Sequence, residues 1–217
     1  YIHYTPNETI EGFQFHEIPE TKDIPLVADM SSEILSKPLD INKFGLIYAG
    51  AQKNIGPAGL SIVILREDLV GFAKPFTPTL YNYKTYVDSQ SLYHTPNTFG
   101  IYLAGLAFEW LLKKGGVESI SKINQRKAQK LYDCIDSTDF YKNTVDKKNR
   151  SDMNVVFYTP SAELDKAFVE ESTNVNLINL KGHKVVGGLR ASIYNAMPES
   201  GVDALIEFMK DFEKRYA

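Results

Sequence analysis

The sequence has little cysteine, no long apolar run and only a small excess of charge. It contains one cysteine, Cys134, in 217 residues, which excludes an internal disulfide framework and fits a reducing compartment. No stretch approaches the roughly 18 uninterrupted apolar residues of a transmembrane helix, and no signal peptide is recognised. The net charge of −3 argues against nucleic acid or a membrane surface as partner. We therefore expect a cytoplasmic protein.

Patterns typical of metal sites and serine hydrolases are also missing. His3 and His16 have no acidic or cysteine partner at ligand spacing, so no metal site is expected. There is no Gly-x-Ser-x-Gly sequence, and Ser31-Ser32 lacks a His/Asp context. Cys134 falls among apolar positions of a predicted helix and is interpreted as a buried core thiol.

The first part of the chain has the pattern of an α/β domain. Residues 1–95 alternate short apolar runs with Gly, Pro, Asn and Asp turns, as buried strands do. Four strands are predicted, at Tyr1–Tyr4, Leu26–Asp29, Leu46–Tyr48 and Ser61–Leu65. We expect a polar loop at Asn7–Gly12 and an irregular excursion at Pro75–Tyr86.

Helical periodicity begins near the middle of the chain. Apolar residues recur at three- and four-residue spacing over Asn97–Lys114, until Gly115-Gly116 interrupts the pattern. Further on, the spacing predicts a helix at Val117–Asp136, another at Leu164–Glu171 and a last one after Pro198, with strands at Asn154–Tyr158, Leu177–Leu180 and Ala191–Tyr194. We therefore expect two domains, 1–115 and a small α+β domain at 116–217 that includes the linking helix.

The most informative segment is Tyr48–Gly59, which places one lysine, Lys53, in a glycine-punctuated stretch between two apolar runs. If such a lysine is partly desolvated, the pKa of its amine falls, which a Schiff-base lysine requires. The alternative is an ordinary lysine of a surface loop. The small neighbouring residues favour the functional interpretation, because they let a cofactor approach the backbone.

A carboxylate at the end of the preceding strand completes a recognisable pair. Asp29 ends the apolar run Ile24–Ala28. One Asp after one strand and one Lys after the next would suit a pyridoxal 5′-phosphate (PLP) site, where the Asp pairs with the pyridinium nitrogen and the Lys holds the aldehyde. Without Lys53 nearby, the better interpretation of Asp29 would be a cap of the turn that follows it.

Three motifs together resemble the phosphoserine aminotransferase family. They are Asp29-Met30-Ser31-Ser32, Gln52-Lys53-Asn54-Ile55-Gly56-Pro57-Ala58-Gly59 and Gly187-Gly188-Leu189-Arg190-Ala191-Ser192-Ile193-Tyr194-Asn195-Ala196-Met197-Pro198. The family comprises PLP-dependent aminotransferases of fold type I, class V. The resemblance implies an α/β fold, with 1–115 as part of a PLP-binding large domain that has a mixed, mainly parallel sheet.

The same resemblance implies further cofactor contacts. Thr9 matches a position that touches the cofactor ring, and Gln52 one near the PLP phosphate; a turn threonine that bonds its own backbone is the alternative for Thr9. His94 and Thr95 match residues that reach the PLP phosphate of the other subunit of a homodimer, with His94 where Asn is frequent. A phosphate also suits the helix start that follows them, although Thr95 or Asn97 could simply cap that helix.

A basic cluster is implied to bind the substrate. Arg190 matches the carboxylate-binding arginine of the family, since a planar guanidinium grips a carboxylate with two hydrogen bonds. His183 and Lys184 match positions that hold the substrate phosphate, with Lys184 where Arg is often found. A solvated basic turn is the alternative.

The implied reaction is amino transfer between O-phospho-L-serine and 2-oxoglutarate in serine biosynthesis, with pyridoxine biosynthesis as a second expected pathway because some bacterial members also act on 4-phosphohydroxy-L-threonine. Another class V enzyme is a rival. Cys134 on a helix does not suit a cysteine desulfurase, which needs a cysteine on a mobile loop, and His183-Lys184 argues against alanine-type aminotransferases.

The start at Tyr1 raises a different alternative. Family members carry roughly 140–150 residues upstream of the matching position, about one further domain. We therefore expect the C-terminal 60% or so of such an enzyme, which is either a non-catalytic fragment or half of a nicked chain bound to its own N-terminal fragment. Alone, it is expected to be inactive or poorly soluble.

Overall fold

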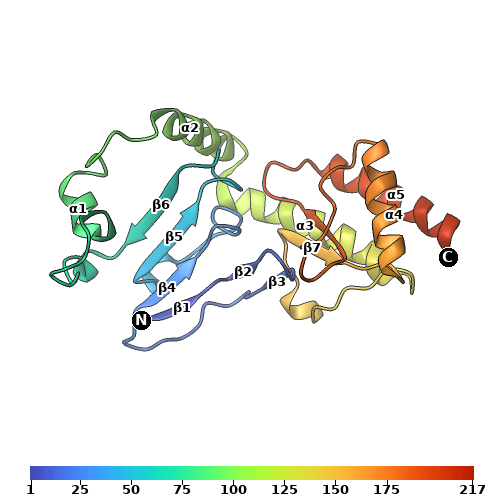
Figure 1. Cartoon of the computed structure of the whole chain (residues 1–217), viewed down its shortest axis with the longest axis horizontal. Coiled ribbons are helices and arrows are strands. Elements are labelled where there is room, and N and C mark those ends of the chain that lie inside the picture. Colours follow the sequence, from blue (N-terminus) through green and yellow to red (C-terminus); the bar gives the residue numbers. More distant parts are fainter.

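Parallel strands in the first half of the chain form the sheet that carries Lys53. The computed structural model describes residues 1–217 (Figure 1). Its strands are β1 (Ile2–Tyr4), β2 (Asn7–Glu8), β3 (Phe13–Gln14), β4 (Leu26–Asp29), β5 (Leu46–Gly50), β6 (Ser61–Leu65), β7 (Asn154–Phe157) and β8 (Leu189–Ser192). Its α-helices are α1 (Tyr83–Asp88), α2 (Thr98–Lys113), α3 (Gly116–Asp136), α4 (Ala162–Asn174) and α5 (Glu199–Tyr216).

The main sheet has four strands in the order β1-β4-β5-β6. β1 and β4 are parallel, as are β4 and β5, whereas β6 runs antiparallel to β5. Side chains alternate between buried and half-buried along β4 and β5, so that Leu26, Ala28, Ile47 and Ala49 enter a cluster of 10 buried residues. The predicted fold class, α/β with a mixed and mainly parallel sheet, is confirmed.

The second half has its own hydrophobic cluster. β7 and β8 form an antiparallel pair, and helices α3, α4 and α5 surround it (Figure 1). The cluster holds 18 buried residues, and its aromatic rings meet edge to face, as Phe168 and Phe212 do at 5.0 Å between centroids. α3 begins directly after Gly115, whose φ of +91° ends α2 as the glycine pair predicted.

A short hairpin from the first half packs against the second half. β2 and β3 pair antiparallel where the sequence predicted only a loop. The hairpin reaches β7 through Gly12, whose carbonyl accepts a hydrogen bond from Ser151 N at 3.0 Å. A Cβ on Gly12 would lie 2.7 Å from Asn154 O, and its φ is +72°, so this close approach requires glycine.

Three further sequence predictions need correction. Leu177–Leu180 is a loop instead of a strand, because Asn176 just before it and Asn179 within it both adopt φ of +64°. The strand expected at Ala191–Tyr194 starts earlier, at Leu189. The excursion at Pro75–Tyr86 contains a 3₁₀ turn and the start of α1, which Asn82 caps through its side chain.

Part of the apolar stripe that predicted α2 faces outward, whereas its last member, Leu111, is buried. Phe99 is 69% exposed and Leu106 43% exposed, because the helix packs inward through its small residues Gly100 and Ala104. Other large apolar side chains of this region, including Phe72 and Phe76, are exposed too. None of the helices combines the length and the apolar character that crossing a membrane requires.

Candidate functional site

Lys53 lies in the tight connection between β5 and β6. The connection folds back on itself, because Gly56 N donates to Ala51 O at 2.8 Å and Ala51 N donates to Leu60 O at 2.9 Å. Gly59 adopts φ of +90°, a conformation that favours glycine. The result is a compact loop that leaves the Lys53 side chain half-buried.

Thr9 touches both Lys53 and Arg190. The amine Nζ of Lys53 donates to Thr9 Oγ1 at 3.2 Å. Arg190 Nη1 donates to the backbone carbonyl of Thr9, also at 3.2 Å. Thr9 lies in the turn of the β2–β3 hairpin and Arg190 on β8. Three segments far apart in sequence therefore bring these predicted site residues together.

Asp29 faces the same region from the end of β4. It is in register with Tyr48 of β5, and its Oδ1 accepts a hydrogen bond from Ser31 N at 2.9 Å, as a turn-capping carboxylate does. Its negative charge also acts on the Lys53 amine. Both interpretations of Asp29 from the sequence are therefore compatible with its position.

The Lys53 amine is electrostatically tuned. Desolvation lowers its pKa from the ordinary 10.5, and the nearby positive charge of Arg190 lowers it further, against the opposing effects of Asp29 and Glu8. Lowering the pKa raises the fraction of neutral amine at a given pH, and only the neutral amine is nucleophilic. The half-buried setting predicted from the sequence is thus present.

Gln52 lies beside Lys53 but points elsewhere. Its side chain is exposed and folds over the backbone of Gly50, with its Oε1 close to where a Cβ of residue 50 would stand. A larger residue at position 50 would displace this side chain.

Within this chain, His94 and Thr95 make no hydrogen bond with Lys53. Both side chains are exposed, and His94 Nδ1 makes a local hydrogen bond with Thr95 O at 3.1 Å. His94 instead lines a cavity of about 570 Å³ with apolar side chains such as Tyr83 and Ile101. Asn97, and not Thr95, caps α2 by accepting from Gly100 N at 2.9 Å.

His183 and Lys184 lie on a turn that leads into β8. The turn closes through hydrogen bonds from Val186 N and Gly187 N to His183 O, at 3.1 and 2.8 Å. The Lys184 side chain is exposed, and no hydrogen bond joins either side chain to Arg190. The turn therefore presents two basic side chains near the start of the strand that carries Arg190, without joining them to it.

Tyr194 is a member of the cluster that residue patterns did not single out. Its hydroxyl accepts from Asn154 Nδ2 at 3.0 Å, burial raises its pKa, and Thr9 and Arg190 lie close enough to lower it in part. Residues 190, 192 and 194 alternate, so they share one face of an extended segment. The spacing of two and four residues from Arg190 was therefore the sequence signal that could have identified Tyr194 as a site residue.

Comparison with known proteins agrees with this geometry. The family model described as "Aminotransferase class-V" matches residues 1–205. The phosphoserine aminotransferase of Hahella chejuensis is 58% identical over 217 residues, which is 100% of this chain and 60% of the relative. That of Haemophilus influenzae is 57% identical over 213 residues, covering 98% of this chain and 59% of the relative. The chain thus spans about 60% of the length of the curated relatives it matches.

Solved structures give the same picture. The phosphoserine aminotransferase from Bacillus circulans subsp. alkalophilus has a TM-score of 0.98 at 50% identity, with 100% of this chain and 60% of that chain covered. The PLP-bound enzyme from Trichomonas vaginalis has a TM-score of 0.93 at 43% identity, with 97% of this chain and 60% of that chain covered.

Proposed function

The chain belongs to the aminotransferase class-V family, and on that premise we propose that it is the C-terminal part of a PLP-dependent phosphoserine aminotransferase. The reaction is amino transfer between O-phospho-L-serine and 2-oxoglutarate, a step of serine biosynthesis. The observation that carries the proposal is the convergence of Lys53, Thr9 and Arg190, because it places a reactive amine beside a group that binds carboxylates.

The donor set fits PLP. A half-buried lysine with a lowered pKa suits the aldehyde, and Asp29, one strand away, suits the pyridinium nitrogen. When bound, PLP supplies a carbonyl that captures amines and a ring that accepts electrons from the substrate Cα. Thr9 would contact the ring, and Gln52 would face the phosphate.

The chain's own residues have distinct roles in this proposal. Lys53 Nζ would hold the cofactor and would accept the proton from the substrate Cα as general base. Asp29 would be the partner of the ring nitrogen. Thr9 keeps the Lys53 amine oriented through the 3.2 Å hydrogen bond.

Substrate recognition is assigned to the second half. Arg190, oriented on one side by the carbonyl of Thr9, would bind the α-carboxylate with its remaining N–H groups. His183 and Lys184 would bind the phosphate of the substrate side chain. Lys184 is exposed and His183 half-buried in this short turn, and Lys184 supplies charge without the planar fork of an arginine.

We also propose a homodimer. His94 and Thr95 are exposed and make no hydrogen bond with Lys53 in their own chain, which suits a contact with the PLP phosphate of the other subunit. The exposed aromatic residues of the same region, such as Phe72, Phe76 and Phe99, form the kind of apolar surface that subunits or a further part of the protein cover.

The division into domains 1–115 and 116–217 is part of the same proposal, supported by the two separate buried clusters.

A cytoplasmic location is supported by the single, unpaired Cys134. A role in pyridoxine biosynthesis would follow if the enzyme also accepts 4-phosphohydroxy-L-threonine.

The test is a transaminase assay on the full-length protein that contains this segment, beside the purified 217-residue chain. We expect the full-length protein to use phosphoserine with 2-oxoglutarate in preference to alanine with glyoxylate, and the short chain to be inactive. Preference for alanine would contradict the substrate assignment. Turnover by the short chain alone would contradict its dependence on an N-terminal fragment, and a monomeric active enzyme would contradict the dimer.

A further inference from the structure

Asn54 follows Lys53 directly, and its side-chain amide bridges the two halves of the molecule. Its Nδ2 donates to Ile34 O at 3.0 Å, within the first half. Its Oδ1 accepts from the backbone N–H of Asn195 at 3.0 Å, within the second half. Because both ends of the amide are bonded, the backbone next to Lys53 is tied to both halves.

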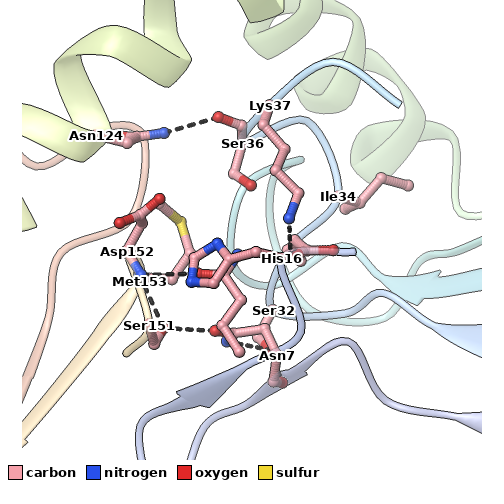
Figure 2. Close-up of polar contacts among 12 residues, drawn as sticks. Asn7, His16, Ser32, Ile34, Ser36, Lys37, Asn124, Ser151, Asp152 and Met153 are labelled. Atoms are coloured by element: carbon pink, nitrogen blue, oxygen red, sulfur yellow. Dashed lines mark hydrogen bonds and ion pairs between the residues drawn. The ribbon is translucent and has the colours of Figure 1, made fainter. Parts of the chain in front are cut away.

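Asn195 is itself held firmly from two directions. Its Nδ2 donates to Leu35 O at 2.9 Å, and its Oδ1 accepts from Asn124 Nδ2 at 2.8 Å. Asn124, on α3, also donates to Ser36 O at 3.1 Å, the contact drawn at the top of Figure 2. The side chains of Asn124 and Asn195 are buried, so these hydrogen bonds have little competition from water.

A buried lysine anchors the turn that contains Asn195. Lys127 lies one helical turn after Asn124 on α3, is fully buried, and donates to the carbonyls of Ile193, Tyr194 and Met197 at 3.0, 2.9 and 3.1 Å. Burial lowers its pKa to about 8. An ammonium group has three donors, and all three are used here, which offsets the cost of its burial.

A second polar network lies beside the first across the same boundary. Asn7 Nδ2 donates to Ser32 Oγ and to Asn154 Oδ1, both at 2.9 Å, and Ser151 Oγ donates to Asn7 Oδ1 (Figure 2). Since Asn7 belongs to the hairpin that carries Thr9, this network fixes Thr9 to the second half. Polar contacts, at Asn54 and at Asn7, thus join the Lys53 region to the second half on both sides.

Three features that cost stability gather around Asn54 and Asn195. Leu35 has φ of +63°, unusual for a residue with a side chain. Asn124 Oδ1 is buried without a hydrogen-bond partner, and Lys127 is buried as described. Features of this kind persist in proteins chiefly where function requires the geometry they impose.

We propose that Asn54 is a positioning residue for Lys53, which fixes the Lys53 side chain relative to Arg190. The connection between Arg190 and Lys53 is short. β8 carries Arg190 and leads directly into the Ile193–Met197 turn, in which the backbone N–H of Asn195 donates a hydrogen bond to Asn54. The proposal rests on the function assigned above to Lys53 and Arg190. Misplacing a reacting group by about 1 Å can reduce a rate by about a hundredfold.

A matched pair of variants in the full-length protein tests this role. The test variant, Asn54→Ala, removes a side-chain amide that donates to a carbonyl and accepts from a backbone N–H. The control variant, Asn143→Ala, removes an amide with the same two kinds of hydrogen bond, to Val156 O at 2.6 Å and from Val145 N at 2.8 Å, at a position that makes no hydrogen bond with Lys53. The two variants should lower the thermal unfolding midpoint to a similar extent.

The distinguishing readout is the titration of the Lys53 amine in cofactor-free protein, followed by pH-dependent amine labelling and peptide mass spectrometry. In Asn54→Ala we expect the Lys53 pKa to rise towards the ordinary 10.5, because a loosened side chain is better hydrated. We also expect kcat to fall about tenfold or more. Asn143→Ala should change neither. Equal titrations and equal kcat values in the two variants would overturn the proposal.

Two further results keep the test decisive. If Asn54→Ala does not fold, Asn195→Ala replaces it, since that change loosens the turn but leaves Asn54 in place; an unshifted Lys53 pKa there also overturns the proposal. If the wild-type protein fails to take up PLP at Lys53, the assigned function is wrong, whatever the variants show.

Discussion

The amine of Lys53 donates a hydrogen bond to the hydroxyl of Thr9, 44 residues away in the sequence, at 3.2 Å. The backbone carbonyl of Thr9 accepts from Arg190, so one residue of a two-strand hairpin sets the spacing between an amine from the first half and a guanidinium from the second. The hairpin can do this because Gly12 lets it pack directly on β7.

Thr9→Val tests the first of these contacts. The change removes the hydroxyl but keeps the side-chain shape and the carbonyl that Arg190 uses. A single hydrogen bond contributes about 1 kcal/mol, so we expect kcat of the full-length enzyme to fall about fivefold, with KM for 2-oxoglutarate unchanged. A raised KM with an unchanged kcat would instead assign Thr9 to substrate binding.

Arg190→Lys separates the carboxylate site from the phosphate site. Since phosphoserine and 2-oxoglutarate both carry an α-carboxylate, loss of bidentate binding should raise KM for both, by about tenfold or more.

Lys184→Ala should raise KM for phosphoserine and leave KM for 2-oxoglutarate as it was. Steady-state kinetics with each substrate varied gives the answer, and an equal effect of Lys184→Ala on both would remove it from the phosphate site.

Gly12→Ala should destabilise the protein through both strain and collision. A methyl group there would lie 2.7 Å from Asn154 O, in a residue with φ of +72°. Gly71→Ala is the control, because Gly71 has φ of +97° and nothing within 4 Å of its would-be Cβ. Strain costs about 1–3 kcal/mol at each site, and denaturant unfolding should show a larger loss at Gly12. Equal losses of stability in the two variants would contradict this expectation, because they would show that a small shift of β7 removes the collision.

The Asp136 carboxylate makes part of the protein's free energy of unfolding dependent on pH. Arg150 and Lys147 hold its pKa at about 2, below the ordinary 3.8. A depressed carboxyl pKa contributes stability that is complete above about pH 3.8 and is lost as the pH falls towards 2. Urea midpoints between pH 5 and pH 2.5 should therefore fall less steeply in Asp136→Asn than in wild type; parallel curves would contradict this contribution.

Local patterns predicted most of the elements. The bounds of β4 and β6 follow directly from apolar runs ended by polar residues, and Gly115 separates α2 from α3 as expected. The failures have local causes that a pattern does not show. The apolar run at Leu177–Leu180 is no strand, because asparagines with positive φ interrupt it.

The site was predictable only in part. Lys53 and Asp29 were recognisable from their places after strands, and the structure brings Lys53, Thr9 and Arg190 into contact. Asn54 was not recognisable as a bridge, since its partner is a backbone N–H 141 residues away. Long-range contacts with backbone groups leave no signature in the identity of either residue.

Borohydride trapping tests most directly whether Lys53 binds PLP. The full-length protein is incubated with PLP, reduced, digested and mapped by mass spectrometry, with Lys53→Ala as control. We expect the cofactor to be attached at Lys53 alone and to be absent from the variant. Attachment at another lysine, or none at all in a folded protein, would contradict the assignment of Lys53 as the lysine that holds the cofactor.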